Sequence, residues 1–487
     1  MPRPNILIVM TDHQRADTVL PEHPAITPHV ARLASEGVTF TNAFCPSPHC
    51  CPSRATFFTG LYPSQHGVWN NICNDQALSR GVREGVRLWS EDLAEAGYDL
   101  HFSGKWHVSV TASPADYGWT EHFLSGHFAQ SRDWEHYQAL AQQALASQAL
   151  ATERGEGEIL RPGYGTYRLY GTRAAAPENH DEQAVQRALD VLPQLARGDS
   201  PWGLFVGLIG PHDPYMVPQR YLDMYDLEDV PLPPSYADTL ADKPRIYQRM
   251  RQTRYGQLSD REVREGIRHF WAYCTYLDDL LGRLLAALDE TGQAENTLVL
   301  FCADHGDYCG EHGLFAKGIP CFQGAYRVPA VMRWPAGIRE PGRRVEQLVS
   351  LADFGPTFLD MAAVPTDRHF TGASLLPFLR GESPENWRDA IFTQCNGVEL
   401  YYTQRSVMTQ EFKYTLNGFD RDELYDLRED PHEMRNLADD PTYEPVKRDL
   451  CRRLWQFAYQ ERDAAINSYI TVALAPYGPA IAFMGEQ

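Results

Sequence analysis

The segment from Cys50 to Gly60 places the residue types of a nucleophile and of an anion site side by side. Pro52 suits the first turn of a helix and Gly60 suits its end, so the segment predicts a short helix with Cys50 just before it. A helix N-terminus presents free N–H groups and a partial positive charge, which favour a bound anion and lower the pKa of a thiol. Arg54 adds a charge-assisted donor at the same place. A buried cysteine pair beside a helix cap is the alternative that this segment leaves open.

Four apolar runs predict strands that each end in ionisable residues. One such end is weak evidence, because an Asp or His after a strand is usually a loop residue or a helix cap. Ligands in an open α/β sheet bind beyond the carboxyl ends of the strands, so four such ends together predict one shared site. The runs and their ends are Asn5–Met10 with Asp12 and His13, Tyr98–Ser103 with Lys105 and His107, Trp202–Ile209 with His212 and Asp213, and Thr297–Ala303 with Asp304, His305 and Asp307.

Helical patterns separate these runs, which predicts an α/β fold with a largely parallel sheet. Short helices are expected at Thr27–Gly37 and Leu88–Gly97, and a long one at Arg261–Thr291, where apolar residues recur at helical spacing. Gln138–Glu153 is rich in Ala, Gln and Leu and predicts an amphipathic helix or insertion. Residues 226–260 carry many prolines and charges, which indicates a surface excursion.

The length of 487 residues predicts about three domains, or one large domain with a smaller one. We favour the second arrangement, with a large α/β domain over residues 1–365 and a smaller C-terminal subdomain over residues 366–487. The subdomain is expected to hold a small antiparallel sheet, a helix and a tail, at Ala390–Gln394 and Tyr401–Met408, Tyr443–Ala464, and Ser468–Gln487 respectively. The apolar tail either packs on a neighbouring subunit of a homo-oligomer or covers the site.

Composition narrows the class of protein. The net charge of −20 argues against a nucleic-acid partner and against an anionic membrane surface. Ordinary globular composition, with 43% hydrophobic and 22% charged residues, excludes disordered and collagen-like chains. No run approaches the ~18 apolar residues of a membrane span, and the first residues lack the pattern of a signal peptide. The ten cysteines form no zinc-type Cys-x-x-Cys pair, so we expect a soluble protein of the reducing cytoplasm.

The run Cys50-Cys51-Pro52-Ser53-Arg54, with Thr59-Gly60 after it, resembles the signature of the formylglycine-dependent sulfatases of the alkaline phosphatase superfamily. The resemblance implies that Cys50 is converted to formylglycine by a maturation enzyme, with Cys51 in the variable position. It covers nearly the whole chain and implies a large alkaline-phosphatase-like sheet flanked by helices, with a smaller C-terminal α+β domain. The other matching motifs are Asp12 after the opening strand, Gly104–His107, Pro211–Pro214, Asp304–Lys317 and Glu423–Asn436.

The resemblance implies hydrolysis of small sulfate monoesters to an alcohol and inorganic sulfate. Asp12, Asp304 and His305, with the modified residue 50, would bind one divalent metal ion; the family favours Ca²⁺, and the imidazole leaves Mn²⁺ or Mg²⁺ open. One hydroxyl of hydrated formylglycine would attack sulfur, and the other would expel sulfate from the covalent intermediate. The remaining roles are Arg54 holding the modified side chain, Lys105 and Lys317 clamping sulfate oxygens, His107 acting as base, and His212 protonating the departing alcohol.

His13 departs from the family pattern, because many sulfatases carry two adjacent aspartates at this point. It is a substituted ligand, a donor behind the metal or a substrate contact, and we favour the last two because His305 already supplies an imidazole. Related phosphonate monoester hydrolases and phosphodiesterases also have a single aspartate after the first strand. Hydrolysis of phosphonate monoesters or phosphodiesters is therefore the alternative function, although the Lys105-x-His107 pair favours sulfatases. A non-catalytic binding protein with unmodified Cys50 is a third hypothesis. Aryl, sugar, choline and alkyl sulfates all stay open as substrates.

Overall fold

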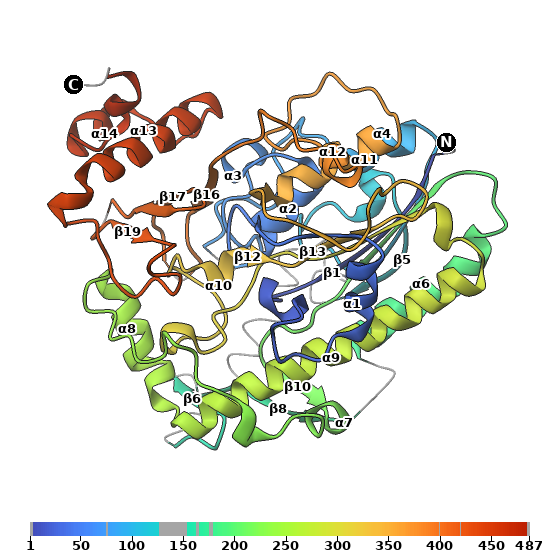
Figure 1. Ribbon diagram of the computed structural model, residues 1–487, viewed down its shortest axis with the longest axis horizontal. Helices are drawn as coiled ribbons and strands as arrows, with labels where there is room; N and C mark the ends of the chain where they lie inside the picture. The colour runs from blue at the N-terminus through green and yellow to red at the C-terminus, as the bar shows by residue number, and fades with distance from the viewer. Residues whose placement is uncertain are drawn as a thin grey trace.

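An eight-stranded sheet forms the centre of the molecule, in the order β14-β2-β13-β11-β1-β9-β4-β5 (Figure 1). The computed structural model describes residues 3–74, 76–125, 153–161, 165–174, 179–398, 400–418 and 420–484, so positions 138–152 of the expected Gln138–Glu153 helix lie outside the described residues. The strands are β1 (Asn5–Thr11), β2 (Val38–Phe40), β4 (Asp99–Lys105), β5 (Thr120–Ser125), β9 (Trp202–Gly207), β11 (Thr297–Ala303), β13 (Ala330–Arg333) and β14 (Arg343–Val345).

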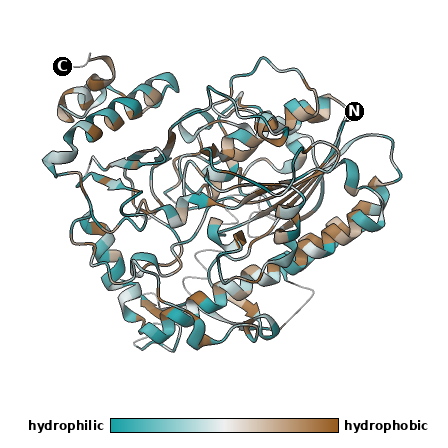
Figure 2. Cartoon of the chain, viewed as in Figure 1, coloured by the Kyte–Doolittle hydropathy of each residue, from teal (hydrophilic) through white to brown (hydrophobic). Residues whose placement is uncertain are grey.

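Five neighbouring strands, from β11 to β5, run parallel, as the sequence predicts. Strand β13 runs antiparallel to both β11 and β2, so the sheet as a whole is mixed. Strands covered on both faces are apolar along their whole length, since neither face meets water. In β1 the run Ile6–Met10 is buried throughout, and the central strands are accordingly brown in Figure 2.

Helices cover both faces of the sheet (Figure 1). One layer holds α1 (Pro28–Ser35), α6 (His180–Leu195) and α9 (Asp260–Glu290), and the other holds α2 (Cys50–Thr59), α4 (Trp89–Glu95) and α11 (Phe354–Met361). The expected helices at Thr27–Gly37, Leu88–Gly97 and Arg261–Thr291 are therefore present as α1, α4 and α9. Helix α9 begins at a capping box in which Glu262 N donates to Ser259 Oγ at 3.3 Å and Ser259 N donates to Glu262 Oε2 at 2.9 Å.

The region 226–260 is more than the surface excursion that its composition predicts. It contains α8 (Arg245–Thr253), and Tyr247 of this helix is fully buried. Tyr247 OH donates to Glu423 Oε1 at 2.8 Å. The prediction is wrong for this part because one aromatic side chain anchors a polar helix against the C-terminal sheet.

A four-stranded antiparallel sheet follows, in the order β16-β17-β18-β19. Its strands are β16 (Ile391–Cys395), β17 (Gln404–Met408), β18 (Phe412–Leu416) and β19 (Glu423–Asp426), and α13 (Glu444–Gln460) packs on it. The second expected strand thus starts at Gln404 and not at Tyr401. An apolar cluster of its own lies between this sheet and α13. The domain boundary after residue 365 stays a prediction.

The described part of the C-terminal tail forms α14 (Ser468–Ala473) and the short helix η9 (Pro479–Phe483). Ile481 is buried against α13, and Trp455 Nε1 donates to Tyr477 O at 2.7 Å. The tail therefore packs on its own chain, away from the edge of the large sheet, contrary to the alternative that it covers the site (Figure 1).

Short strands complete the fold as small sheets. These are β3 (Ala43–Phe44) with β12 (Arg327–Val328) and β15 (Val349–Ser350), β6 (Glu158–Arg161) with β7 (Gly165–Arg168), and β8 (Tyr170–Arg173) with β10 (Tyr215–Pro218). Within the described ranges, none of the helices combines the length and apolarity that crossing a membrane requires.

Candidate active site

The carboxyl ends of four parallel strands bring the candidate side chains to one edge of the sheet. Asp12 follows β1, Lys105 ends β4, His212 follows β9 and Asp304 follows β11. These strands are direct neighbours in the sheet, so their ends meet. Asp12 and His305, which are 293 positions apart in the sequence, therefore lie in one cluster, as the four strand ends predict.

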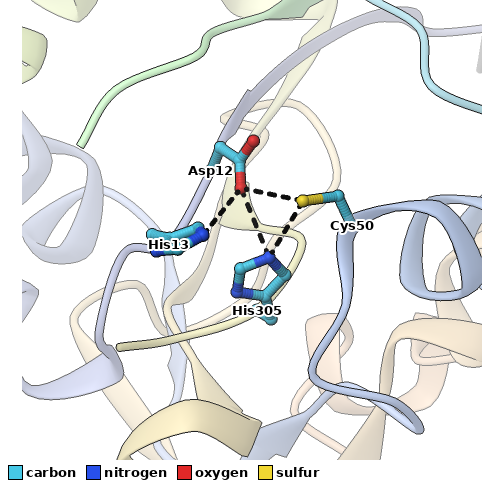
Figure 3. Close-up of side chains that lie close together, drawn as sticks. All are labelled: Asp12, His13, Cys50 and His305. Carbon is cyan, nitrogen blue, oxygen red and sulfur yellow. Dashed lines mark hydrogen bonds and ion pairs between the residues drawn. The ribbon is translucent and has the colours of Figure 1, made fainter. Parts of the chain in front are cut away.

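Cys50 belongs to this cluster and lies beside Asp12 and His305 (Figure 3). It is the first residue of α2 and not the residue before it, because the extended His49 precedes the helix. Its Sγ lies 3.3 Å from His305 Nε2, 3.6 Å from Asp12 Oδ1 and 3.3 Å from Lys317 Nζ. Burial raises the pKa of the thiol, but the charges of Lys105, Lys317 and His305 outweigh it and hold that pKa well below its usual range. The surroundings of residue 50 thus favour an anionic group.

A group of possible metal donors surrounds the same point. Asp12, His13, Cys50 and His305 each offer one ligand atom, and these atoms all lie within 4.8 Å of one another (Figure 3). The pKa of Asp12 is held well below its usual range despite its burial, chiefly by Lys105 and by a hydrogen bond from His305. A carboxylate and imidazoles at this spacing fit a divalent ion. Asp304 adjoins the group, with Oδ1 3.7 Å from His305 Nε2.

Arg54 is fully buried and links α2 to two strand ends. Its Nε donates to Asp304 Oδ2 at 2.7 Å, and its Nη1 donates to the backbone oxygen of Lys105 at 2.8 Å. Its Nη2 is buried and has no hydrogen-bond partner among the described residues. One charge-assisted donor thus stays available for an oxygen of a ligand or of a modified residue 50.

Two ammonium groups flank Cys50. Lys105 Nζ contacts Asp12 Oδ2, and Lys317 Nζ contacts His13 Nε2 and lies 3.4 Å from His212 Nε2. Burial lowers the pKa of each lysine, but Asp12 and Cys50 more than compensate and raise both pKa values above the ordinary range. Both side chains therefore stay cationic, as clamping an anion requires.

The two candidate proton-transfer residues, His107 and His212, both interact with residue 50. Burial raises the pKa of the Cys50 and Cys73 thiols, and the buried His107, which has a left-handed φ of 61°, is among the groups that lower the pKa of both. The side chain of His212 is 32% exposed, and its Nδ1 donates to Asp213 O at 2.6 Å. Burial and Lys317 lower the pKa of His212, but Asp213, Cys50 and Asp12 raise it above its ordinary value. The raised pKa favours the protonated form of His212, which a general acid requires, and its partial exposure leaves the ring accessible.

His13 has partners that the sequence did not reveal. Its Nδ1 lies 3.1 Å from Asp307 Oδ2 and 3.6 Å from Asp213 Oδ1. Tyr215 OH donates to Asp307 Oδ2 at 2.8 Å. Asp213 lies in the Pro211–Pro214 motif and Asp307 follows the Thr297–Ala303 strand, so the sequence marks both residues but not their contact with His13.

Two other residues of the Asp304–Lys317 motif lie outside the cluster. Glu311 Oε1 accepts a hydrogen bond from Arg15 Nη2 at 2.8 Å, and His312 Nδ1 lies 2.8 Å from Asp238 Oδ2. Their contacts shape the loop between β11 and Lys317.

Comparison with known proteins agrees with this arrangement. Residues 4–364 match the family model described as Sulfatase, and residues 310–460 match the model described as N-sulphoglucosamine sulphohydrolase, C-terminal. The chain is 31% identical over 483 residues to the uncharacterized sulfatase YidJ of Escherichia coli strain K12, covering 95% of this chain and 88% of that protein. It is 30% identical over 466 residues to the choline-sulfatase of Rhizobium meliloti strain 1021, covering 90% of this chain and 83% of that protein.

Solved structures show the same fold. The phosphonate monoester hydrolase of Agrobacterium radiobacter matches with a TM-score of 0.76 at 25% identity, covering 95% of this chain and 97% of that one. Fold and site together define a hydrolase of the alkaline phosphatase superfamily. Within it, the chain belongs to the sulfatase family, as its motifs predict. The predicted enzyme class, a sulfuric ester hydrolase, is confirmed.

Proposed function

We propose that this enzyme hydrolyses sulfate monoesters to an alcohol and inorganic sulfate, with formylglycine made from Cys50 as the nucleophile. The observation that carries the proposal is the position of Cys50, buried at the first residue of α2 and in contact with Asp12, His305 and Lys317. Sulfuryl transfer needs an activated nucleophile and preorganised cations for the oxygens of the sulfate group. Both converge on residue 50, and the choline-sulfatase among the relatives supports the proposal.

The residues around position 50 fit a divalent metal ion. Asp12, Asp304 and His305, with the modified residue 50, would hold it. When bound, such an ion polarises an oxygen and favours the anionic form of the nucleophile. The family resemblance favours Ca²⁺, with Mn²⁺ and Mg²⁺ as alternatives.

The other side chains act on the substrate or on residue 50. Lys105 and Lys317 bind oxygens of the sulfate group, and Arg54 Nη2 donates to the oxygen of the modified residue 50. His212, on the solvent side, donates a proton to the departing alcohol. His107 accepts the proton from residue 50 when sulfate leaves. The family resemblance supplies these assignments, and the closeness of the side chains to residue 50 supports them.

Phosphonate monoester hydrolysis is the second candidate, with the same nucleophile and metal site. Two observations favour it: the likeness to the Agrobacterium radiobacter enzyme over 97% of that chain, and His13 in place of a second aspartate. Sulfate monoesters, phosphonate monoesters and phosphodiesters all carry a single negative charge at neutral pH. The charge of the site therefore does not discriminate between these substrates. Discrimination must come from contacts with the groups bonded to the central sulfur or phosphorus atom.

Steady-state kinetics on matched substrates tests the choice. The chain would be co-expressed with a formylglycine-generating maturation enzyme and assayed with an aryl sulfate, an aryl phosphonate monoester and a phosphodiester of the same phenol. We expect the highest kcat/KM for the sulfate, with release of inorganic sulfate, and none with the Cys50→Ala variant. A preference of orders of magnitude for the phosphonate or the diester would establish the second candidate instead.

The proposal implies one macromolecular partner, the maturation enzyme, which must act on Cys50 before α2 packs, since the folded chain buries this residue. The homo-oligomer and the cytoplasmic location stay predictions.

A further inference from the structure

His13 is the residue at which this chain departs from the sulfatase pattern. From its contacts we infer that His13 is a metal ligand through Nε2, so that the site offers two imidazoles and prefers a transition-metal ion such as Mn²⁺ over Ca²⁺. The inference rests on the proposed function, because it concerns the same metal site. It differs from the expectation that His13 stands behind the metal or contacts the substrate.

Asp307 sets the tautomer of His13 through its contact with Nδ1. Its Nδ1 lies 3.1 Å from Asp307 Oδ2, and an ionised carboxylate only accepts hydrogen bonds, so Nδ1 carries the proton. Asp307 is itself held in place: Tyr215 OH donates to Oδ2 at 2.8 Å, and Cys309 N donates to Oδ1 at 2.8 Å. The ring therefore has a fixed orientation and a fixed donor.

The front of the ring presents a lone pair. Lys317 Nζ contacts His13 Nε2, and an ammonium group only donates, so Nε2 is the acceptor. Nε2 lies 3.9 Å from Asp12 Oδ1, and His13 is one of the four residues whose ligand atoms lie within 4.8 Å of one another. Figure 3 shows His13 and His305 next to each other, each joined to Asp12 by a dashed line. His13 Nε2 and Asp12 Oδ1 are therefore close enough to bind the same cation.

His305 is arranged in the same way. Its Nδ1 lies 2.9 Å from the backbone oxygen of Gly306, which only accepts, so Nδ1 carries a proton and Nε2 is the nitrogen that could bind a metal ion in place of a proton. The centroids of the two rings are 4.4 Å apart. A ligating histidine almost always donates its other N–H to a carboxylate or a carbonyl, which fixes the tautomer and raises its basicity. His13 with Asp307, and His305 with Gly306, each follow this rule.

Two imidazoles change which ion the site prefers. Ca²⁺ takes six to eight oxygen ligands, whereas imidazole nitrogen suits transition metals, above all Zn²⁺, Fe²⁺ and Ni²⁺, with Mn²⁺ the weakest binder of that series. An aspartate at position 13 would keep the donor set rich in oxygen, and the histidine does not. The structure thus assigns the departure at position 13 to metal selectivity.

Pulsed EPR of bound Mn²⁺ counts the ligating nitrogens without any turnover. The holoenzyme would be stripped with a chelator and loaded with Mn²⁺ alone, with histidine labelled by ¹⁵N. We expect two imidazole nitrogens in the wild type and one in His13→Asn. The matched control is His212→Asn, which removes a ring centred 4.0 Å from that of His13 and is expected to keep both nitrogens.

Competition between Mn²⁺ and Ca²⁺ gives a second readout. His13→Asp is expected to shift the affinity ratio toward Ca²⁺ by about 10-fold or more, and Asp307→Asn to weaken Mn²⁺ binding by about 10-fold, as expected for loss of a partner behind a ligand. A single nitrogen in the wild type, or two retained in His13→Asn, would overturn the inference. The wild-type count decides even if a variant fails to fold. Failure of the wild type to bind either ion would contradict the metal site of the proposed function instead.

Discussion

Arg54 Nε donates to Asp304 Oδ2 at 2.7 Å, and neither side chain has any exposed surface. This ion pair ties the first turn of α2, which carries Cys50, to the carboxyl end of β11. It is therefore both a structural bond and the contact that positions the proposed nucleophile against the metal-site residues.

Removing the guanidinium should cost stability as well as activity. Arg54→Ala leaves Asp304 charged and buried without its partner, which destabilises a protein by about 3–5 kcal/mol. We expect Arg54→Ala to abolish turnover and to lower the free energy of unfolding by this amount in urea denaturation. Arg54→Lys, the matched control, keeps the charge but not the planar fork and should recover only part of the stability. An active, fully stable Arg54→Ala variant would contradict the assignment.

The two adjacent cysteines should behave differently. Cys50→Ala is expected to abolish turnover, because residue 50 is the proposed nucleophile. Cys51 is fully buried, and its thiol interacts with Cys73. Cys51→Ala should therefore stay active and lose about 1 kcal/mol of stability, the usual cost of a small buried change. If the Cys51 variant were inactive and the Cys50 variant active, the nucleophile would be wrongly assigned.

The pH dependence of kcat/KM should report His212. A general acid must be protonated, and Asp213, Cys50 and Asp12 raise the pKa of His212 above its ordinary 6.5 against burial and Lys317. Activity on an alkyl sulfate, a poor leaving group, should therefore fall only as pH rises through this raised pKa. His212→Asn should remove that limb and lower the rate by about 10²–10⁴-fold, and by less for an aryl sulfate with an acidic phenol. An unchanged alkaline limb in the variant would exclude His212 as the acid.

Acid stability should depend on His66. Burial and Arg83 lower the pKa of His66 to about 3 from 6.5. The unfolded chain therefore takes up a proton between these values that the folded chain does not, so stability falls as pH falls through this window. The slope is about 1.4 kcal/mol per pH unit for one such group. Unfolding free energies of His66→Asn should show a shallower slope than the wild type, and equal slopes would contradict the account.

The tail offers a test of the predicted homo-oligomer. Tyr469 and Val472 of α14 are 85% and 80% exposed, whereas Ile481 is 1% exposed against α13. Truncation after Asn467 should lower Tm because it uncovers α13, and the double variant Tyr469→Ser, Val472→Ser should not. If the tail joins subunits, both proteins should elute later than the wild type in gel filtration. An unchanged oligomer in both would rule out that role.

The sequence predicts the parts of the fold that leave a periodic or continuous apolar signal. Strand β1 is buried on both faces, and α9 has both helical spacing and a capping box, so the sequence predicts both elements. The sequence does not predict the antiparallel direction of β13, because a strand of four residues carries no signal of its direction. The same limit holds in the site. The motifs identify Cys50 and its neighbours, but the contact of His13 with Asp307 joins residues 294 positions apart, and only the folded chain reveals it.

The central claim is that residue 50 acts as formylglycine. Peptide mass spectrometry measures the modified fraction directly, because conversion of cysteine lowers the residue mass by about 18 Da. Preparations made with increasing amounts of maturation enzyme should show sulfatase activity proportional to this fraction, with no activity at zero conversion. Full activity on sulfate esters in a preparation that carries only the intact Cys50 thiol would contradict the account.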